Sequence, residues 1–84
     1  MGTSYLLLLC TVHKNIEIAD TIRKFPGVKE AIPVIGAYDC VVKTEMTSPD
    51  DVNNLVLTSI RPLAHVRSVL TLHDAPKLLL SENA

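Results

Sequence analysis

The sequence has no tryptophan, one phenylalanine, two tyrosines, three glycines and two cysteines. Cys10 and Cys40 stand alone, without the CxxC pairs of zinc sites or redox motifs, which excludes both classes of site. Isolated cysteines of this kind pack as small hydrophobic residues. We therefore expect two reduced, buried cysteines in a cytoplasmic protein.

The sequence also lacks long runs of basic residues and long runs of apolar residues. The formal net charge is −1 and Arg23-Lys24 is the only adjacent basic pair, so the basic excess that nucleic-acid binding requires is lacking. The apolar runs at residues 6–10 and 78–80 are too short to span a membrane, and no secretory leader is visible. These absences predict that neither nucleic acid nor a membrane is a direct partner.

The sequence contains no Ser-His-Asp arrangement and no phosphate-binding glycine loop. His13, His65 and His73 lack the spacing of metal ligands, so we expect them at the surface or the rim of the fold. Asp50 and Asp51 lie in the first turn of a predicted helix, where acids suit the helix dipole. The sequence therefore predicts no catalytic residues, no metal and no cofactor.

Apolar residues, by contrast, make up 48% of the 84-residue chain. A chain of this length has room for one domain with a modest core, which we assign to residues 1–84, with 74–84 as a C-terminal tail. So much apolar surface is difficult for a small monomer to bury. The composition therefore predicts self-association.

The centre of the chain predicts a β-hairpin. Pro26 and Gly27 end the preceding helix, because proline cannot continue it and glycine accepts the left-handed conformation. Residues 28–35 form the first strand, and Pro33, which has no N–H to donate, restricts that strand to a sheet edge. Gly36-Ala37 make the turn. Residues 38–45 form a second strand that is apolar on both faces, as a central strand is.

Residues 5–12, also apolar on both faces, predict another central strand, preceded by a frayed start at residues 1–4. Asn15 is the expected N-cap of the first helix. The apolar stripe of that helix is Ile18, Ala19, Ile22 and Phe25.

The second helix has the strongest local signal, with Ser48 at the cap and Pro49 at the first helical position. Pro62 blocks its continuation, and residues 66–73 alternate as a fourth strand. Residues 77–80 fit either a short strand or a helical turn.

The predicted order is β-α-β-β-α-β, with a weak internal repeat in which residues 25–29 recur in form as 63–67. Two split βαβ units build an α+β ferredoxin-like sandwich of the dimeric α/β-barrel type, with the antiparallel sheet order 4-1-3-2. Two helices cover only one face of that sheet. Because each apolar side chain left wet on the other face forgoes about 1.5–3 kcal/mol, we expect a homodimer packed sheet to sheet.

In this topology the end of the first strand, the start of the first helix and the hairpin turn meet at one rim. Polar and small residues that we expect there are His13, Asn15, Gly36, Tyr38, Asp39 and His65. Gly36 lets a ligand approach bare backbone, and Asp39 can bind an ammonium. Alternatively, Gly36 supplies only turn geometry and Asp39 bonds only its own backbone.

The motif Phe25-Pro26-Gly27-Val28 followed by Gly36-x-Tyr38-Asp39 resembles the effector-binding (RAM) domain of the Lrp/AsnC, or leucine-responsive, transcription regulators. The resemblance covers roughly residues 5–73. It implies a dimer formed by sheet stacking, often assembled into a ring of dimers, with an amino acid bound between dimers near the hairpin corner. The ligand-binding residues that it indicates are Ile35, Gly36, Ala37, Tyr38 and Asp39.

Full-length members of that family carry an N-terminal helix-turn-helix domain, whereas the first strand here is expected from Tyr5 onward. The chain thus resembles a stand-alone sensing module, not an enzyme, that works with full-length regulators. It departs from the family at Ala64-His65, where a second Pro-Gly is usual. Two alternatives stay open: a small ferredoxin-like enzyme of the cofactor-free monooxygenase or isomerase type, and a pure assembly partner with an empty corner.

Overall fold

The structure, a computed structural model, describes residues 2–46 and 48–74. Its strands and helices follow one another in the order β1 (Gly2–Cys10), α1 (Asn15–Ile22), β2 (Val28–Pro33), β3 (Cys40–Met46), α2 (Pro49–Leu55) and β4 (Val66–His73). Helix α2 continues into a π-helical turn, η1 (Val56–Ile60). The predicted β-α-β-β-α-β order is confirmed.

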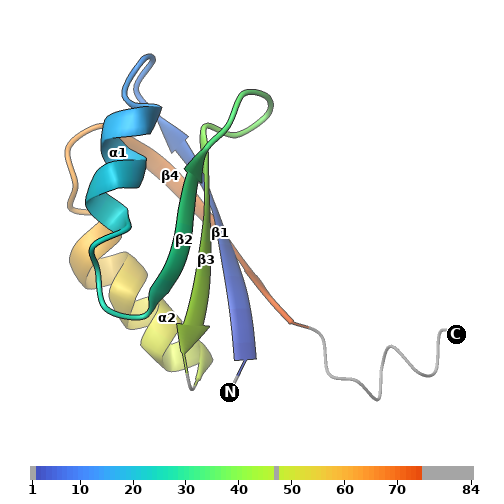
Figure 1. The fold of residues 1–84 in the computed structure, drawn as a ribbon. Coiled ribbons are helices and arrows are strands. Elements are labelled where there is room, and N and C mark those ends of the chain that lie inside the picture. The colour runs from blue at the N-terminus through green and yellow to red at the C-terminus, as the bar shows by residue number, and fades with distance from the viewer. Residues whose placement is uncertain (1, 47, 75–84) are drawn as a thin grey trace, which may run out of the picture.

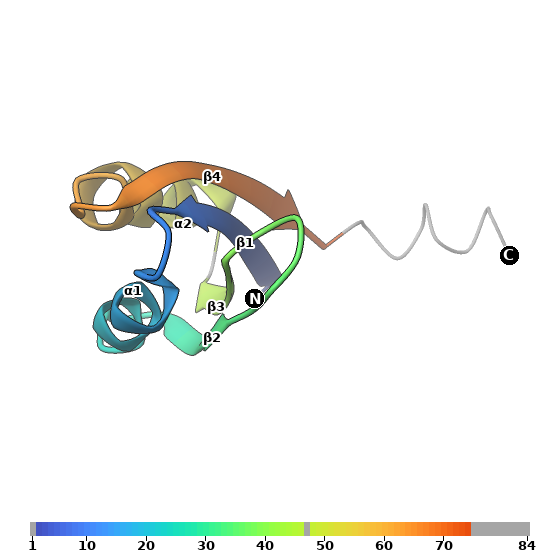
Figure 2. The same ribbon diagram turned by 90° about the horizontal axis from the view of Figure 1, so that it is seen from above.

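The four strands form one antiparallel sheet in the order β2-β3-β1-β4, which is the predicted order read from the other edge. Both helices lie on one face of this sheet, and no described element covers the other face (Figure 1). The view from above shows the same two layers (Figure 2). The core lies between them, and its fully buried side chains include Leu6, Leu8, Ile22, Val42 and Ile60.

Two local signals in the sequence have the predicted structural result. Strand β2 is an edge strand and ends at Pro33, so the missing N–H of this proline interrupts no ladder between two neighbours. Ser48 is the N-cap of α2, and its side chain accepts a hydrogen bond from the backbone N–H of Asp51 at 3.3 Å. Pro49 occupies the first turn, where its missing N–H is not needed.

The prediction that Asn15 caps α1 is wrong. Lys14 holds the N-cap position without a side-chain hydrogen bond, and Asn15 is the first residue of the helix. The Asn15 side chain instead donates from Nδ2 to the carbonyl oxygen of Val34 at 3.4 Å. This contact ties the start of α1 to the β2–β3 hairpin, a long-range partner that the local sequence does not specify.

The frayed start predicted for residues 1–4 is also wrong, since β1 begins at Gly2. Ser4 is buried, and its hydroxyl shares a 2.7 Å hydrogen bond with Nδ1 of His73. At the rim the strands are shorter than expected, because β1 ends at Cys10, β2 at Pro33, and β3 begins only at Cys40. The first helix ends at Ile22 rather than at the expected Phe25. The prediction for residues 77–80 lies outside the described residues.

The internal repeat of the sequence is a repeat of one turn. Gly27 and His65 occupy equivalent positions before β2 and β4, with left-handed φ angles of 86° and 79°. Each turn is closed by the same bond: Val28 N–H donates to Phe25 O at 3.2 Å, and Val66 N–H donates to Leu63 O at 3.3 Å. His65 therefore adopts the same left-handed turn as Gly27, although it carries a side chain.

These paired turns predict unequal effects of alanine. Gly27→Ala places a Cβ in the left-handed region and should lower the free energy of unfolding by about 1–2 kcal/mol. His65→Ala keeps a Cβ that is already there and should change it by less than about 0.5 kcal/mol. Urea unfolding of both variants measures the difference. Equal losses would show that the left-handed φ is not what distinguishes the two positions.

Candidate functional site

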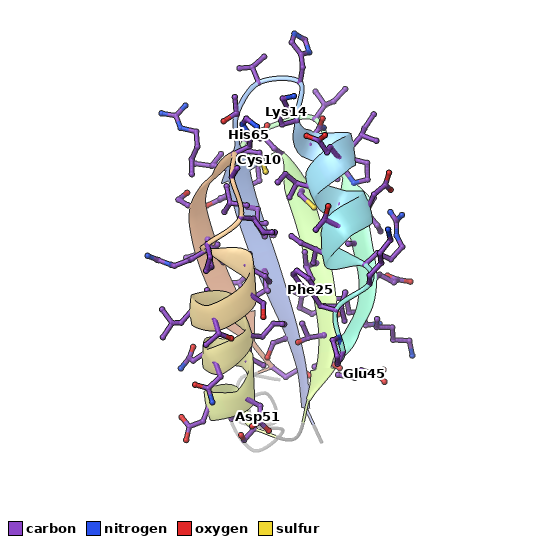
Figure 3. All side chains as sticks on the ribbon, turned by 90° about the vertical axis from the view of Figure 1, so that its left-hand side faces the viewer. Cys10, Lys14, Phe25, Glu45, Asp51 and His65 are labelled. Atoms are coloured by element: carbon purple, nitrogen blue, oxygen red, sulfur yellow. The ribbon has the colours of Figure 1, made fainter. Side chains whose placement is uncertain are left out.

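The β1–α1 turn and the β2–β3 hairpin project from the same end of the molecule (Figure 1). Cys10, Lys14 and His65 lie at this end, whereas Asp51 and Glu45 lie at the opposite end (Figure 3). The turn before β4 joins the rim through a 2.8 Å hydrogen bond from Thr11 N–H to His65 O. The structure thus brings together the end of β1, the start of α1 and the hairpin, as the topology predicts, with the turn before β4 beside them.

Asp39 anchors the hairpin to β1. Its backbone N–H donates to Leu8 O at 2.8 Å, and its backbone oxygen accepts from Val34 N–H at 2.9 Å. Its carboxylate oxygen Oδ2 accepts from the backbone N–H of Cys10 at 2.7 Å. Asp39 therefore bonds the backbone of a neighbouring strand rather than its own. Within the described part of the chain, Oδ1 has no hydrogen bond, so half of a positioned carboxylate stays available for a ligand.

Both cysteines are buried beneath this rim and are not bridged. Burial raises the pKa of the Cys40 thiol to about 11, with a further contribution from Cys10. Burial also raises the pKa of Cys10, and the nearby Asp39 carboxylate adds to that shift. Because both thiols are neutral at physiological pH, they act as apolar packing groups rather than as nucleophiles.

Gly36 has a φ of +149°, a conformation that residues with side chains rarely adopt. A Cβ built at this position meets no atom within 4 Å. The turn therefore requires glycine for its backbone conformation, while the space beside it is open. This combination is compatible with both interpretations of Gly36, as a turn residue and as a point of close approach.

An open groove of about 440 Å³ runs between the β1–α1 turn and the hairpin, and we call it the hairpin groove. It is lined by Thr11, Val12, His13, Asn15, Ile16, Val34, Ile35, Gly36 and Asp39. Among the five ligand-binding residues indicated by the sequence, Ile35, Gly36 and Asp39 line this groove. Ala37 is exposed and Tyr38 is half-buried, and neither lines it.

Apolar side chains that the sequence analysis did not single out also line the hairpin groove. Val12 is 73% exposed and Ile16 is 63% exposed. Ile16 lies outside the buried stripe of α1, and an isoleucine at such a position indicates from sequence an exposed apolar side chain. The sequence predicts Val12 in a strand, and only the structure shows that β1 ends before it and leaves it in the turn.

A second open groove, of about 450 Å³, lies on the other side of Asp39, between the end of β1 and the start of β4. We call it the β1–β4 groove. It is lined by Leu9, Cys10, Val12, Asp39, Arg67 and Ser68. Asp39 and Val12 line both grooves, so the two grooves meet at these residues.

The histidines do not gather into one site. His13 lines the hairpin groove and His65 precedes β4, but His73 pairs with Ser4 on a different part of the sheet. Within the described residues, no group of three or more His, Cys, Asp or Glu side chains could hold a metal ion. None of the helices described is long and apolar enough to cross a membrane.

Comparison with known proteins identifies the family that this chain matches. The model of the Lrp/AsnC ligand binding domain matches residues 5–73. A homocitrate synthase from Sulfurisphaera tokodaii is 41% identical over 46 residues. Those residues are 55% of this chain and 10% of the enzyme, so the chain matches only a small part of that protein.

Two solved structures illustrate the shared fold. The hypothetical protein PHS023 from Pyrococcus horikoshii has a TM-score of 0.81 at 28% identity, covering 90% of this chain and 92% of that chain. The transcriptional regulator NMB0573 from Neisseria meningitidis, solved as a complex with L-Met, has a TM-score of 0.77 at 15% identity. That match covers 92% of this chain and 51% of the regulator, so this chain spans about half of it.

Proposed function

This chain belongs to the Lrp/AsnC ligand binding domain family, and from that membership we propose that it is an amino-acid-sensing homodimer that works with transcription regulators. Its effector binds at the hairpin corner, and its partners are a second copy of itself and full-length regulators of the same family. The chain makes no direct contact with DNA and acts in the cytoplasm. The observation that carries the proposal is the open, largely apolar hairpin groove with one positioned carboxylate.

The chemistry of that groove suits a small amino acid. The Asp39 carboxylate is held by Cys10 N–H through one oxygen, and the other can accept from an ammonium. Exposed apolar side chains stand beside it, including Ile35, which is fully exposed. Burial of such surfaces by a ligand or a neighbouring dimer is favourable. The L-Met complex of a regulator with the same fold supports the same ligand class.

The uncovered face of the sheet supports the dimer. A row of apolar side chains crosses it from β2 to β4 in direct register: Ile32, Val41, Leu7 and Leu70. Ile32 is 48% exposed and Leu70 is 45% exposed. Fully burying an exposed side chain of this kind contributes about 1.5–3 kcal/mol, and because these two are already half-buried, a second sheet adds roughly half of that for each. A symmetric partner presents the same row and is complementary to it.

The interior of the fold favours binding over catalysis. Ferredoxin-like enzymes need a polar pocket between helices and sheet, whereas the described buried side chains are apolar except Ser4 and Thr44, which hydrogen-bond within the protein. A homocitrate synthase contains a segment similar to 46 residues of this chain, which supports a second setting for the module, as one segment of a longer enzyme.

A thermal-shift screen of the common L-amino acids, with molecular mass measured in parallel, tests the proposal. A ligand present at 100 times its Kd stabilises the folded state by about 2.7 kcal/mol, which for a domain of this size raises Tm by roughly 10 °C or more. We expect at least one amino acid to give such a shift. If none does while the dimer persists, the chain is a pure assembly partner and the sensing function is wrong.

A further inference from the structure

Arg67 and Asp39, two residues of opposite charge, both line the β1–β4 groove. Resting on the function proposed above, we propose that these two residues bind the charged groups of the amino acid effector. In this arrangement Arg67 takes the carboxylate and Asp39 takes the ammonium. The charged end of the effector then lies in the β1–β4 groove, and its side chain reaches the hairpin groove, which shares Asp39 and Val12. Arg67 thereby becomes a ligand-binding residue that lies outside the hairpin.

A β-bulge places Arg67 in the groove. In the pairing of β1 with β4, Leu9 is opposite Ser68 but Cys10 is opposite Val66, so Arg67 is an extra residue with no partner on β1. In a regular strand Arg67 would lie on the same face as Val69, which packs against the core. The bulge takes Arg67 out of that alternation and leaves it exposed. Bulges re-aim side chains in this way beside many active sites.

The two charges face the same open space without neutralising each other. Neither Arg67 nor Asp39 forms an ion pair with any residue in ranges 2–46 and 48–74. Asp39 is fixed by the 2.7 Å bond from Cys10 N–H, and a guanidinium presents paired donors that match a carboxylate. An α-amino acid carries one charge of each sign on neighbouring atoms. It therefore satisfies both residues at once, whereas a simple anion or cation satisfies one.

The other residues that line the β1–β4 groove include the apolar side chains Leu9 and Val12, which can contact the carbon atoms of such a ligand. Leu9 pairs with Ser68 two residues beyond the pair of Leu7 and Leu70 on the same face of the sheet. The groove therefore lies toward the end of the uncovered face rather than at its centre.

The test compares Arg67→Gln and Arg67→Lys with Arg61→Gln. Arg61 is also exposed but lines neither groove, so it controls for the loss of one positive charge. Each protein is titrated by calorimetry with the common L-amino acids and with the amides of those that bind. Circular dichroism confirms that the variants are folded, which we expect because Arg67 is an exposed side chain.

We expect Arg67→Gln to weaken the best amino acid by about 10- to 100-fold, the scale of charge-assisted hydrogen bonds. Arg67→Lys should retain part of the affinity, and Arg61→Gln should retain all of it. The amide of that amino acid should bind the parent weakly and should lose no further affinity in Arg67→Gln, because it lacks the carboxylate that Arg67 contacts. An amino acid that binds parent and Arg67→Gln equally would overturn the role of Arg67 and leave the sensing function intact. Absence of binding to the parent would overturn both.

Discussion

Leu70→Asp is expected to convert the dimer into a folded monomer. Leu70 lies at the end of the apolar row on the uncovered face and is 45% exposed in the single chain, so an aspartate there stays hydrated when the chain is alone. In the dimer the same carboxylate would be buried without a partner, at a cost of several kcal/mol. Twofold symmetry doubles that cost, which is enough to dissociate the dimer at micromolar concentration.

The matched control is Leu57→Asp, because Leu57 is 61% exposed and lies on η1, on the helical side of the molecule. Sedimentation velocity should give twice the 9.2 kDa chain mass for the parent and for Leu57→Asp. It should give the single-chain mass for Leu70→Asp. A Leu70→Asp protein that remains dimeric would place the interface on another surface.

The second large effect is expected at Asp39. Asp39→Asn keeps an oxygen that can accept from Cys10 N–H, so the hairpin stays anchored while the charge is lost. Binding of an amino acid should weaken by roughly 1–3 kcal/mol, or about 5- to 150-fold. Calorimetric titration measures the change, with circular dichroism to confirm folding. Unchanged affinity in a folded Asp39→Asn protein would remove Asp39 from the site.

Two further variants separate charge from structure. Asp39→Ala also removes the acceptor for Cys10 N–H, and leaving that group unpaired should lower the free energy of unfolding by about 1–3 kcal/mol. Asp20→Asn removes a carboxylate on α1 whose partner is the exposed Arg23. Exposed ion pairs contribute little, and Asp20 lines neither groove at the rim, so both stability and ligand binding should be nearly unchanged.

The architecture could be predicted from the sequence because its signals are local and mutually consistent. Pro33 restricts one strand to an edge, Ser48 and Pro49 start a helix, and double-sided apolar strands belong in the centre of a sheet. The similarity of residues 25–29 and 63–67 corresponds to one repeated turn before β2 and β4, even though Ala64-His65 stands in place of Pro-Gly. Each of these features needs only a few neighbouring residues to determine it.

The composition of the site depended on contacts between distant parts of the chain. The bulge opposite Leu9 and Cys10 aims Arg67 outward, and no residue type in β4 marks that bulge. Asn15 has the residue type of a helix cap, but the carbonyl of Val34 on the hairpin takes its side chain instead. The sequence predicts Asp39 as a ligand-binding residue, but its hydrogen bond to Cys10 depends on the register of β1 against β3.

Amide chemical shifts measured during titration with the common L-amino acids test most directly whether an amino acid binds at this rim. We expect one or more of these amino acids, at millimolar concentration, to move the amide signals of residues 11–15, 34–39 and 67–68 in a saturable way. Signals around Ser48 and His73, outside both grooves, should stay in place. Shifts confined to those distant residues, or no saturable shift with any amino acid, would contradict the account.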